Sequence, residues 1–85
     1  MAVDLLYFAW VRESIGCDGE TVEPPSHVAS VSDLLDWLAA SSEPHSNAFA
    51  DRARLRAAVD QRFVPLDTAI VGAREIAIFP PVTGG

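Results

Sequence analysis

Apolar residues follow helical spacing in one segment of the chain and strand-like runs elsewhere. The helical stripe consists of four residues, Val31, Leu34, Leu35 and Leu38. Intervals of three and four residues place these side chains on one face of a helix. Ser30 precedes the stripe as a candidate N-cap. Asp33, three residues after Ser30, is an acidic variant of the capping-box residue. We therefore predict a helix over residues 30–41, with Pro44 just beyond its end.

Runs rich in β-branched and aromatic residues predict strands. They cover residues 3–11, 19–23, 55–60, 63–64 and 75–79. We expect a turn at residues 12–16, a short second helix at residues 47–52 and a loop at residues 67–74. The order of elements predicts an α+β domain, in which one main helix lies across one face of a mixed sheet of about five strands.

Alternation along the strands indicates which side chains point away from the helix. In the first run Asp4 marks the solvent side, so Leu6 and Phe8 share its face. In the last run the two isoleucines are expected in the core, which turns Phe79 outward. If these two strands are neighbours at the centre of the sheet, the outward residues form an apolar patch, which Phe63 could extend. Such patches usually mark interfaces; the alternative is that a loop or a second layer covers them.

Composition narrows the classes of partner. Hydrophobic residues make up 49% of the 85 residues and charged residues 21%, as in one globular domain. No apolar run is long enough to span a membrane, and nothing at the N-terminus indicates a signal peptide, so we expect a cytoplasmic protein. The net charge of −6 argues against nucleic acid and membrane partners and favours a protein with a basic surface. Solubility alone would also explain this charge.

Several kinds of site chemistry lack support in the sequence. Cys17 is the only cysteine, which excludes an internal disulfide. His27 and His45 lie far apart with no accompanying ligand pattern, so we interpret them as loop histidines and predict no metal site. All six basic residues are arginine. A chain that carries an activated acyl group benefits from having no lysine amine to attack it, although codon usage also explains this composition.

The chain ends in a segment with no helix or strand signal, residues 80–85, which we separate from a folded domain at residues 1–79. Pro80 and Pro81 cannot pair in a sheet and favour an extended backbone. Gly84 and Gly85 leave the tip slim enough to thread a narrow channel, although glycine-rich ends are also common in frayed termini. Beyond Phe79 the segment reaches about 20 Å at roughly 3.3 Å per residue.

Four segments together resemble the molybdopterin synthase small-subunit family, whose members are ubiquitin-like sulfur carriers related to the thiamine sulfur carrier. They are residues 5–16, 57–61, 75–79 and the ending 80–85. The resemblance covers essentially the whole chain and implies a β-grasp fold. Residues 59–61 and 72–75 depart from the sequences usual in the family.

The resemblance also implies a role for the tail. Gly85 would be adenylated by a ubiquitin-activating-like adenylyltransferase that uses ATP, and then converted to a thiocarboxylate. The sulfur would pass to a pyranopterin precursor in the large synthase subunit, within a heterotetramer, and the chain itself would bind no cofactor. The tail residues that would enter the large subunit are Pro80, Pro81, Val82, Thr83 and Gly84. The residues that would dock on its surface are Phe8, Phe63, Phe79 and Arg12, the last of which also reads as a solvated turn residue.

Three other functions stay open. The chain could carry sulfur for another pathway, such as thiamine or cysteine synthesis. It could be a ubiquitin-like modifier joined through Gly85 to lysines of other proteins. It could also be a binding module whose tail is inert.

Overall fold

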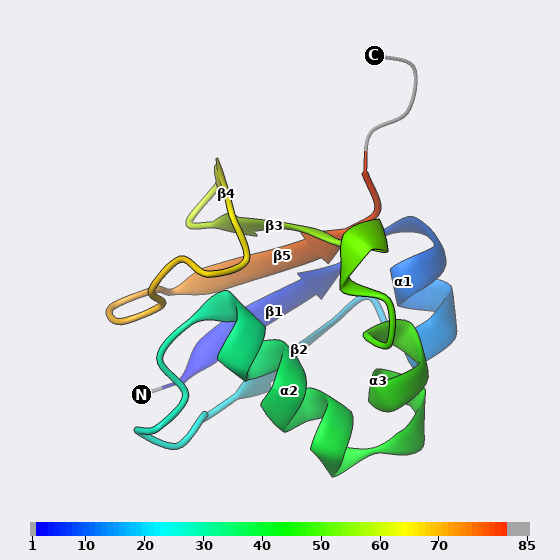
Figure 1. Ribbon diagram of the computed structural model, residues 1–85, viewed down its shortest axis with the longest axis horizontal. Coiled ribbons are helices and arrows are strands. Elements are labelled where there is room, and N and C mark those ends of the chain that lie inside the picture. The colour runs from blue at the N-terminus through cyan, green and yellow to red at the C-terminus, as the bar shows by residue number, and fades with distance from the viewer. Residues whose placement is uncertain (1, 82–85) are drawn as a thin grey trace.

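The computed structural model describes residues 2–81, which form a five-stranded mixed sheet with helices on one side (Figure 1). Its elements are β1 (Val3–Tyr7), α1 (Ala9–Ile15), β2 (Gly19–Val22), α2 (Val31–Ser41), α3 (Glu43–Ala48), the 3₁₀ turn η1 (Arg52–Arg54), β3 (Arg56–Val59), β4 (Arg62–Val64) and β5 (Glu75–Phe79). The strand order is β2-β1-β5-β3-β4. β1 and β5 are parallel and the other pairs antiparallel. The predicted α+β class and the central pairing of the first and last strands are confirmed.

The helix predicted at residues 30–41 is confirmed as α2, and its N-terminus is capped as expected. The Ser30 hydroxyl accepts a hydrogen bond from the backbone N–H of Asp33 at 3.1 Å, while the Asp33 carboxylate accepts one from the N–H of Ala29. The stripe from Val31 to Leu38 is at most 2% exposed. It packs on the inward residues of β1 and β5, so burial of one face of the helix builds the core.

The first strand is shorter than predicted, and residues 9–15 form a helix instead of strand and turn. Val11 is fully buried, and Ile15, one helical turn later, packs against the core. Gly16 ends α1 with a left-handed φ of 97°, and its N–H donates to the carbonyl of Arg12. Apolar spacing of four residues followed by glycine is a helix signal. The aromatic and β-branched residues of the run concealed it.

The helix predicted at residues 47–52 lies earlier in the chain, as α3. The Ser42 hydroxyl caps it by accepting from the N–H of His45, and Pro44 occupies the first turn. Proline is well tolerated there because its missing N–H has no partner in a helix anyway. Pro44 follows the end of α2 at Ser41, as expected, and it also lies in the first turn of the next helix. The prediction of His45 as a loop residue is likewise wrong.

A two-residue turn at Asp60 and Gln61 joins β3 to β4, and both residues have positive φ, 49° and 70°. The Asp60 carboxylate accepts hydrogen bonds from the backbone N–H groups of Arg74 and Glu75, at 2.9 and 3.0 Å. It thereby fixes the start of β5, which lies between β1 and β3. This turn lies in one of the segments that depart from the family's usual sequence.

Replacing Asp60 by alanine is expected to lower the free energy of unfolding by about 1–3 kcal/mol, because two backbone donors lose their acceptor and alanine is disfavoured at positive φ. The substitution Asp60→Asn is the matched control. Asparagine keeps an acceptor oxygen and tolerates this backbone, so D60N should lose less than half as much. Urea unfolding of the three proteins measures the difference; equal stability of D60A and the parent would contradict it.

Candidate docking face and tail

The sheet has one face without helices, and the strand register arranges its middle into a row. Leu6 lies opposite Ala77, Ala77 opposite Ala58, and Ala58 opposite Phe63. The two alanines are 9% and 7% exposed, since they are small and lie between larger neighbours. The row is therefore low at its centre and higher on both sides, where Leu6 and Phe63 stand.

Phe8 and Phe79, which we predicted to face outward, lie beside this row near the end of β5, and Phe63 ends the row. Phe63 is 81% exposed and Phe8 47% exposed, whereas Phe79 is half-buried. The rings of Phe63 and Phe79 pack at a centroid distance of 5.5 Å with an angle of 49° between their planes. Phe63 thus extends the patch, an orientation that the alternation of residues had left open. Within residues 2–81 neither a loop nor a second layer covers Phe8 or Phe63.

The tail begins at this aromatic end of the sheet. Phe79 is the last residue of β5, and Pro80 and Pro81 follow with no helix or strand. β5 runs parallel to β1, so it finishes beside the point where β1 passes into α1 (Figure 1). The predicted residues Val82, Thr83, Gly84 and Gly85 lie outside the described residues. Arg12 is exposed on α1, in a helix and not in the predicted turn.

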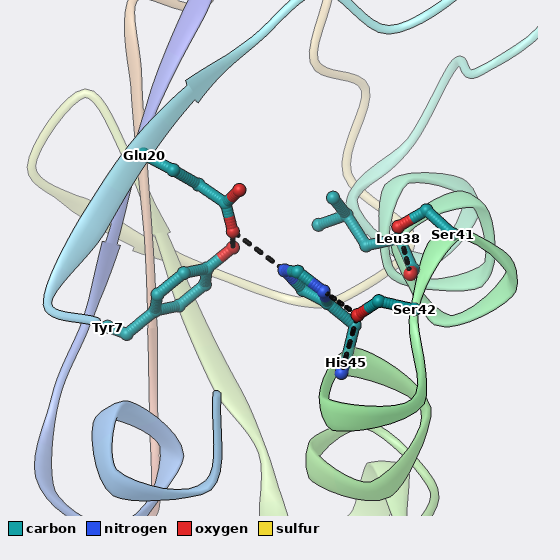
Figure 2. Close-up of polar contacts among 6 residues, drawn as sticks. All are labelled: Tyr7, Glu20, Leu38, Ser41, Ser42 and His45. Carbon is teal, nitrogen blue, oxygen red and sulfur yellow. Dashed lines mark hydrogen bonds and ion pairs between the residues drawn. The ribbon is translucent and has the colours of Figure 1, made fainter. Parts of the chain in front are cut away.

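A second cluster of polar side chains lies on the helical side and joins three elements (Figure 2). The hydroxyl of Tyr7 in β1 donates to Oε2 of Glu20 in β2 at 2.7 Å. Nε2 of His45 in α3 lies 2.7 Å from the same oxygen. Its Nδ1 contacts the hydroxyl of Ser42, the residue between α2 and α3. The cluster therefore ties the junction of the two helices to the edge of the sheet.

Burial and hydrogen bonding set the titration of this cluster. Burial raises the pKa of the Tyr7 phenol far above its usual range, and the adjacent carboxylate of Glu20 raises it further. For Glu20 itself, burial acts to raise the pKa, but hydrogen bonds from His45 and Tyr7 outweigh it and lower the pKa below its ordinary value. The folded state therefore stabilises Glu20 in its ionised form.

Replacing Glu20 by glutamine is expected to lower the free energy of unfolding by about 1–2 kcal/mol at pH 6, because two charge-assisted hydrogen bonds become neutral ones. A carboxyl with a lowered folded-state pKa stabilises the fold above its unfolded pKa of about 4.3, and this contribution disappears as pH falls through the folded value. The deficit of E20Q should therefore shrink at acidic pH. Denaturant titrations at several pH values test this, with exposed Glu23→Gln as the control; a deficit independent of pH would contradict it.

Sequence interpretation missed this cluster, and only part of it had a local signal. Ser42 and His45 have the three-residue spacing of a helix cap, and Pro44 lies between them. Nothing in the sequence indicated Glu20 as their partner. Among residues 2–81 no three His, Cys, Asp or Glu side chains gather closely enough to hold a metal ion. In the same residues, no helix has the length and apolar character needed to cross a membrane.

A mixed sheet with helices on one face, and a chain end that leaves its central strand, defines a β-grasp domain of the ubiquitin-like class. The chain belongs to the ThiS family, which matches residues 5–85. It is 39% identical over 83 residues to the molybdopterin synthase sulfur carrier subunit of Escherichia coli (strain K12), covering 98% of this chain and 99% of that relative.

Two solved structures have the same fold. SAMP1 from Haloferax volcanii superposes with a TM-score of 0.74 at 27% identity, over 100% of both chains. A chain in the complex of subunits 1 and 2 of the molybdopterin-converting factor from Helicobacter pylori 26695 superposes with a TM-score of 0.63, again over 100% of both chains. With 20% sequence identity, this superposition shows a common fold and nothing beyond it.

Proposed function

We propose that this chain is the sulfur carrier of a molybdopterin synthase and acts through the carboxylate of Gly85. The observation that carries the proposal is the placement of the tail. β5 lies inside the sheet, and it ends at Phe79 beside an exposed aromatic patch. A partner that binds the patch is therefore within reach of the tail, because six residues span at most about 20 Å when fully extended. Identity to the Escherichia coli carrier over nearly the whole chain supports the same role.

The proposed chemistry uses the terminal carboxylate, which is a poor acyl donor until it is activated. An adenylyltransferase that consumes ATP joins AMP to Gly85 and releases pyrophosphate. Sulfur then displaces AMP and leaves a thiocarboxylate, whose anionic sulfur is a strong nucleophile. The large synthase subunit positions the pyranopterin precursor and transfers protons. The sulfur forms a bond to a carbon of the precursor, from which an oxygen leaving group departs. Water then cleaves the bond between that sulfur and the acyl carbon of Gly85, which leaves the sulfur on the precursor and regenerates the carboxylate. The carrier thus returns to the cycle, which we place in the cytoplasm.

The proposed docking surface consists of Phe8, Phe63, Phe79 and Arg12. The packed rings of Phe63 and Phe79 provide the kind of anchor that dominates many interfaces. Phe8, whose backbone N–H donates to the carbonyl of Ile78, adds a third exposed aromatic side chain, and Arg12 adds a polar contact at the rim. Pro80 and Pro81 would direct the tail away from the sheet, while Val82, Thr83 and Gly84 would line the path to the reacting glycine. The large synthase subunit is the partner we assign to this surface. The Helicobacter pylori structure with the same fold is itself a complex of subunits 1 and 2 of the molybdopterin-converting factor.

The direct test is intact-mass analysis of the protein purified from cells that make the cofactor. The proposal predicts a fraction heavier by the exchange of one oxygen for sulfur, located in the C-terminal peptide. This form should produce molybdopterin when mixed with the large subunit and the precursor, and the unmodified form should not. Absence of the heavier form in cells with an active pathway would reject the proposal.

A ubiquitin-like modifier is the second candidate. SAMP1 of Haloferax volcanii is a small archaeal modifier protein, and the likeness of this chain to it extends over the whole chain. A modifier would form an isopeptide bond between Gly85 and a lysine of another protein. Mass spectrometry of cell extracts would then find Gly-Gly remnants on target lysines after digestion. A carrier for thiamine or cysteine synthesis would instead transfer its sulfur only when the reconstitution described above contains the partner subunit of that other pathway.

A further inference from the structure

A groove of about 560 Å³ crosses the open face of the sheet over β1 and β2. Leu6 lies on its floor, opposite Gly19 in the neighbouring strand. A Cβ atom on Gly19 would lie 2.8 Å from the carbonyl oxygen of Leu5 and 3.4 Å from a methyl carbon of Leu6. The absence of a side chain at this position therefore leaves one side of Leu6 uncovered and keeps the groove open.

The two ends of this groove differ in charge. Phe8, Arg12 and Asp18 line the end where the tail begins, so a positive and a negative side chain offset each other there, while Asp4 and Glu75 make the opposite end negative. Asp4 and Glu75 are register partners on the parallel strands β1 and β5. The carboxylate of Asp4 accepts one hydrogen bond, from the hydroxyl of Thr21 at 2.7 Å. Among residues 2–81, neither carboxylate has a cationic side chain within ion-pair distance.

Two carboxylates side by side in a sheet repel each other and destabilise it. An apolar floor next to two such groups suits a long basic side chain, whose aliphatic stem lies on apolar surface while its charged head meets the carboxylates. The guanidinium group of arginine has the geometry to bridge both of them. A cation placed at the other end would meet Arg12 as well as Asp18. The end with Asp4 and Glu75, which has two carboxylates and no arginine, is therefore the one that favours a cation.

We propose that this groove receives an arginine or lysine of the large synthase subunit, with its stem on Leu6 and its head between Asp4 and Glu75. The proposal rests on the proposed function, since it takes the same partner. The groove shares Phe8 with the aromatic docking surface, so one partner covers both. The four residues beyond Pro81 extend by about 13 Å, which holds a partner that binds Gly85 close to this face. Because this contact lies apart from the aromatic docking surface, the two contacts together fix the orientation of the carrier on the large subunit.

The experiment uses the full chain and the large subunit, with D4N/E75Q as the test variant. These changes keep the size of both side chains and remove their charge. Calorimetry at low and high salt should show roughly tenfold weaker binding at low salt and a shallower dependence on salt. E43Q/D67N removes two charges as well, from exposed positions outside the groove, and should change the affinity less than about twofold.

Thermal unfolding separates a loss of contact from a loss of structure. D4N/E75Q should melt at or above the temperature of the parent, because the substitution relieves repulsion. Unchanged affinity and salt dependence, alongside weaker binding by Phe63→Ala, would overturn the groove contact and leave the proposed function standing. A change in self-association without a change in large-subunit binding would also overturn it, by assigning the groove to a second copy. Loss of the proposed function would appear separately, as an absent thiocarboxylate.

Discussion

A chain that ends at Thr83 is expected to produce no molybdopterin, while it still binds the large subunit. The truncation removes Gly84 and Gly85, and with them the only carboxylate that the proposed adenylation uses. The new terminus carries a β-branched side chain and lies about 7 Å short of the original one. The expected rate is that of the reaction without carrier, measured by pterin product in single-turnover mixtures. Residual binding follows from the docking surface, which the truncation leaves in place.

A second variant makes the tail experiment specific to position. Adding one glycine after Gly85 keeps the Gly-Gly ending and moves the carboxylate by about 3.3 Å. We expect binding close to that of the parent and a strongly reduced rate of transfer, because the reacting atom no longer meets the site. Full activity of the chain ending at Thr83 would refute the proposed role of the tail.

Replacing Phe63 by alanine is expected to weaken binding to the large subunit by about 30-fold or more, equivalent to about 2 kcal/mol. Phe63 is 81% exposed, so its ring adds little to the stability of the free chain and remains available to a partner. The ring of Phe63 packs on the ring of Phe79. This contact holds the Phe63 side chain in place before binding and so lowers the conformational entropy that it loses on association. Calorimetry with the purified large subunit measures the change.

Val71 provides the matched control, because it is 92% exposed and lies in the loop before β5, away from the aromatic patch. Val71→Ala should bind as the parent does, and both variants should unfold at nearly the parent temperature. Equal affinities of the Phe63 and Val71 variants would contradict the assignment of Phe63 to the docking surface. Phe79 is a less suitable target, since its half-buried ring also packs within the fold.

Elements with a strong local signal could be predicted from the sequence, and those set by distant contacts could not. α2 combined a complete apolar stripe with a cap at Ser30, and β5 was bounded correctly at residues 75–79. α1 was misread because Trp10 and Val11 favour strands intrinsically, while burial of Val11 in the core decides the outcome. Propensity is a weak prior that tertiary packing overrides.

The candidate site divides in the same way. Alternation along β5 sufficed to turn Phe79 outward, since the period of two is a property of every strand. The same alternation continues from β1 into Phe8, because that residue, although it lies beyond the strand, keeps an extended backbone before α1. The contact of Phe63 with Phe79 required the register of three strands, β4, β3 and β5. The bond between Glu20 and His45 joins an edge strand to a short helix, and no spacing rule relates two such positions.

The position of β5 bears on how the domain responds to load. When the tip of the tail is held in a partner, pulling is transmitted through Phe79 along the axis of β5. Hydrogen bonds to β1 on one side and to β3 on the other then oppose sliding together, in shear. If the tail instead followed a strand at the edge of the sheet, hydrogen bonds on only one side of that strand would oppose the pull. A pull on the C-terminal tail can therefore remove the carrier from its partner without unfolding the domain from its last strand.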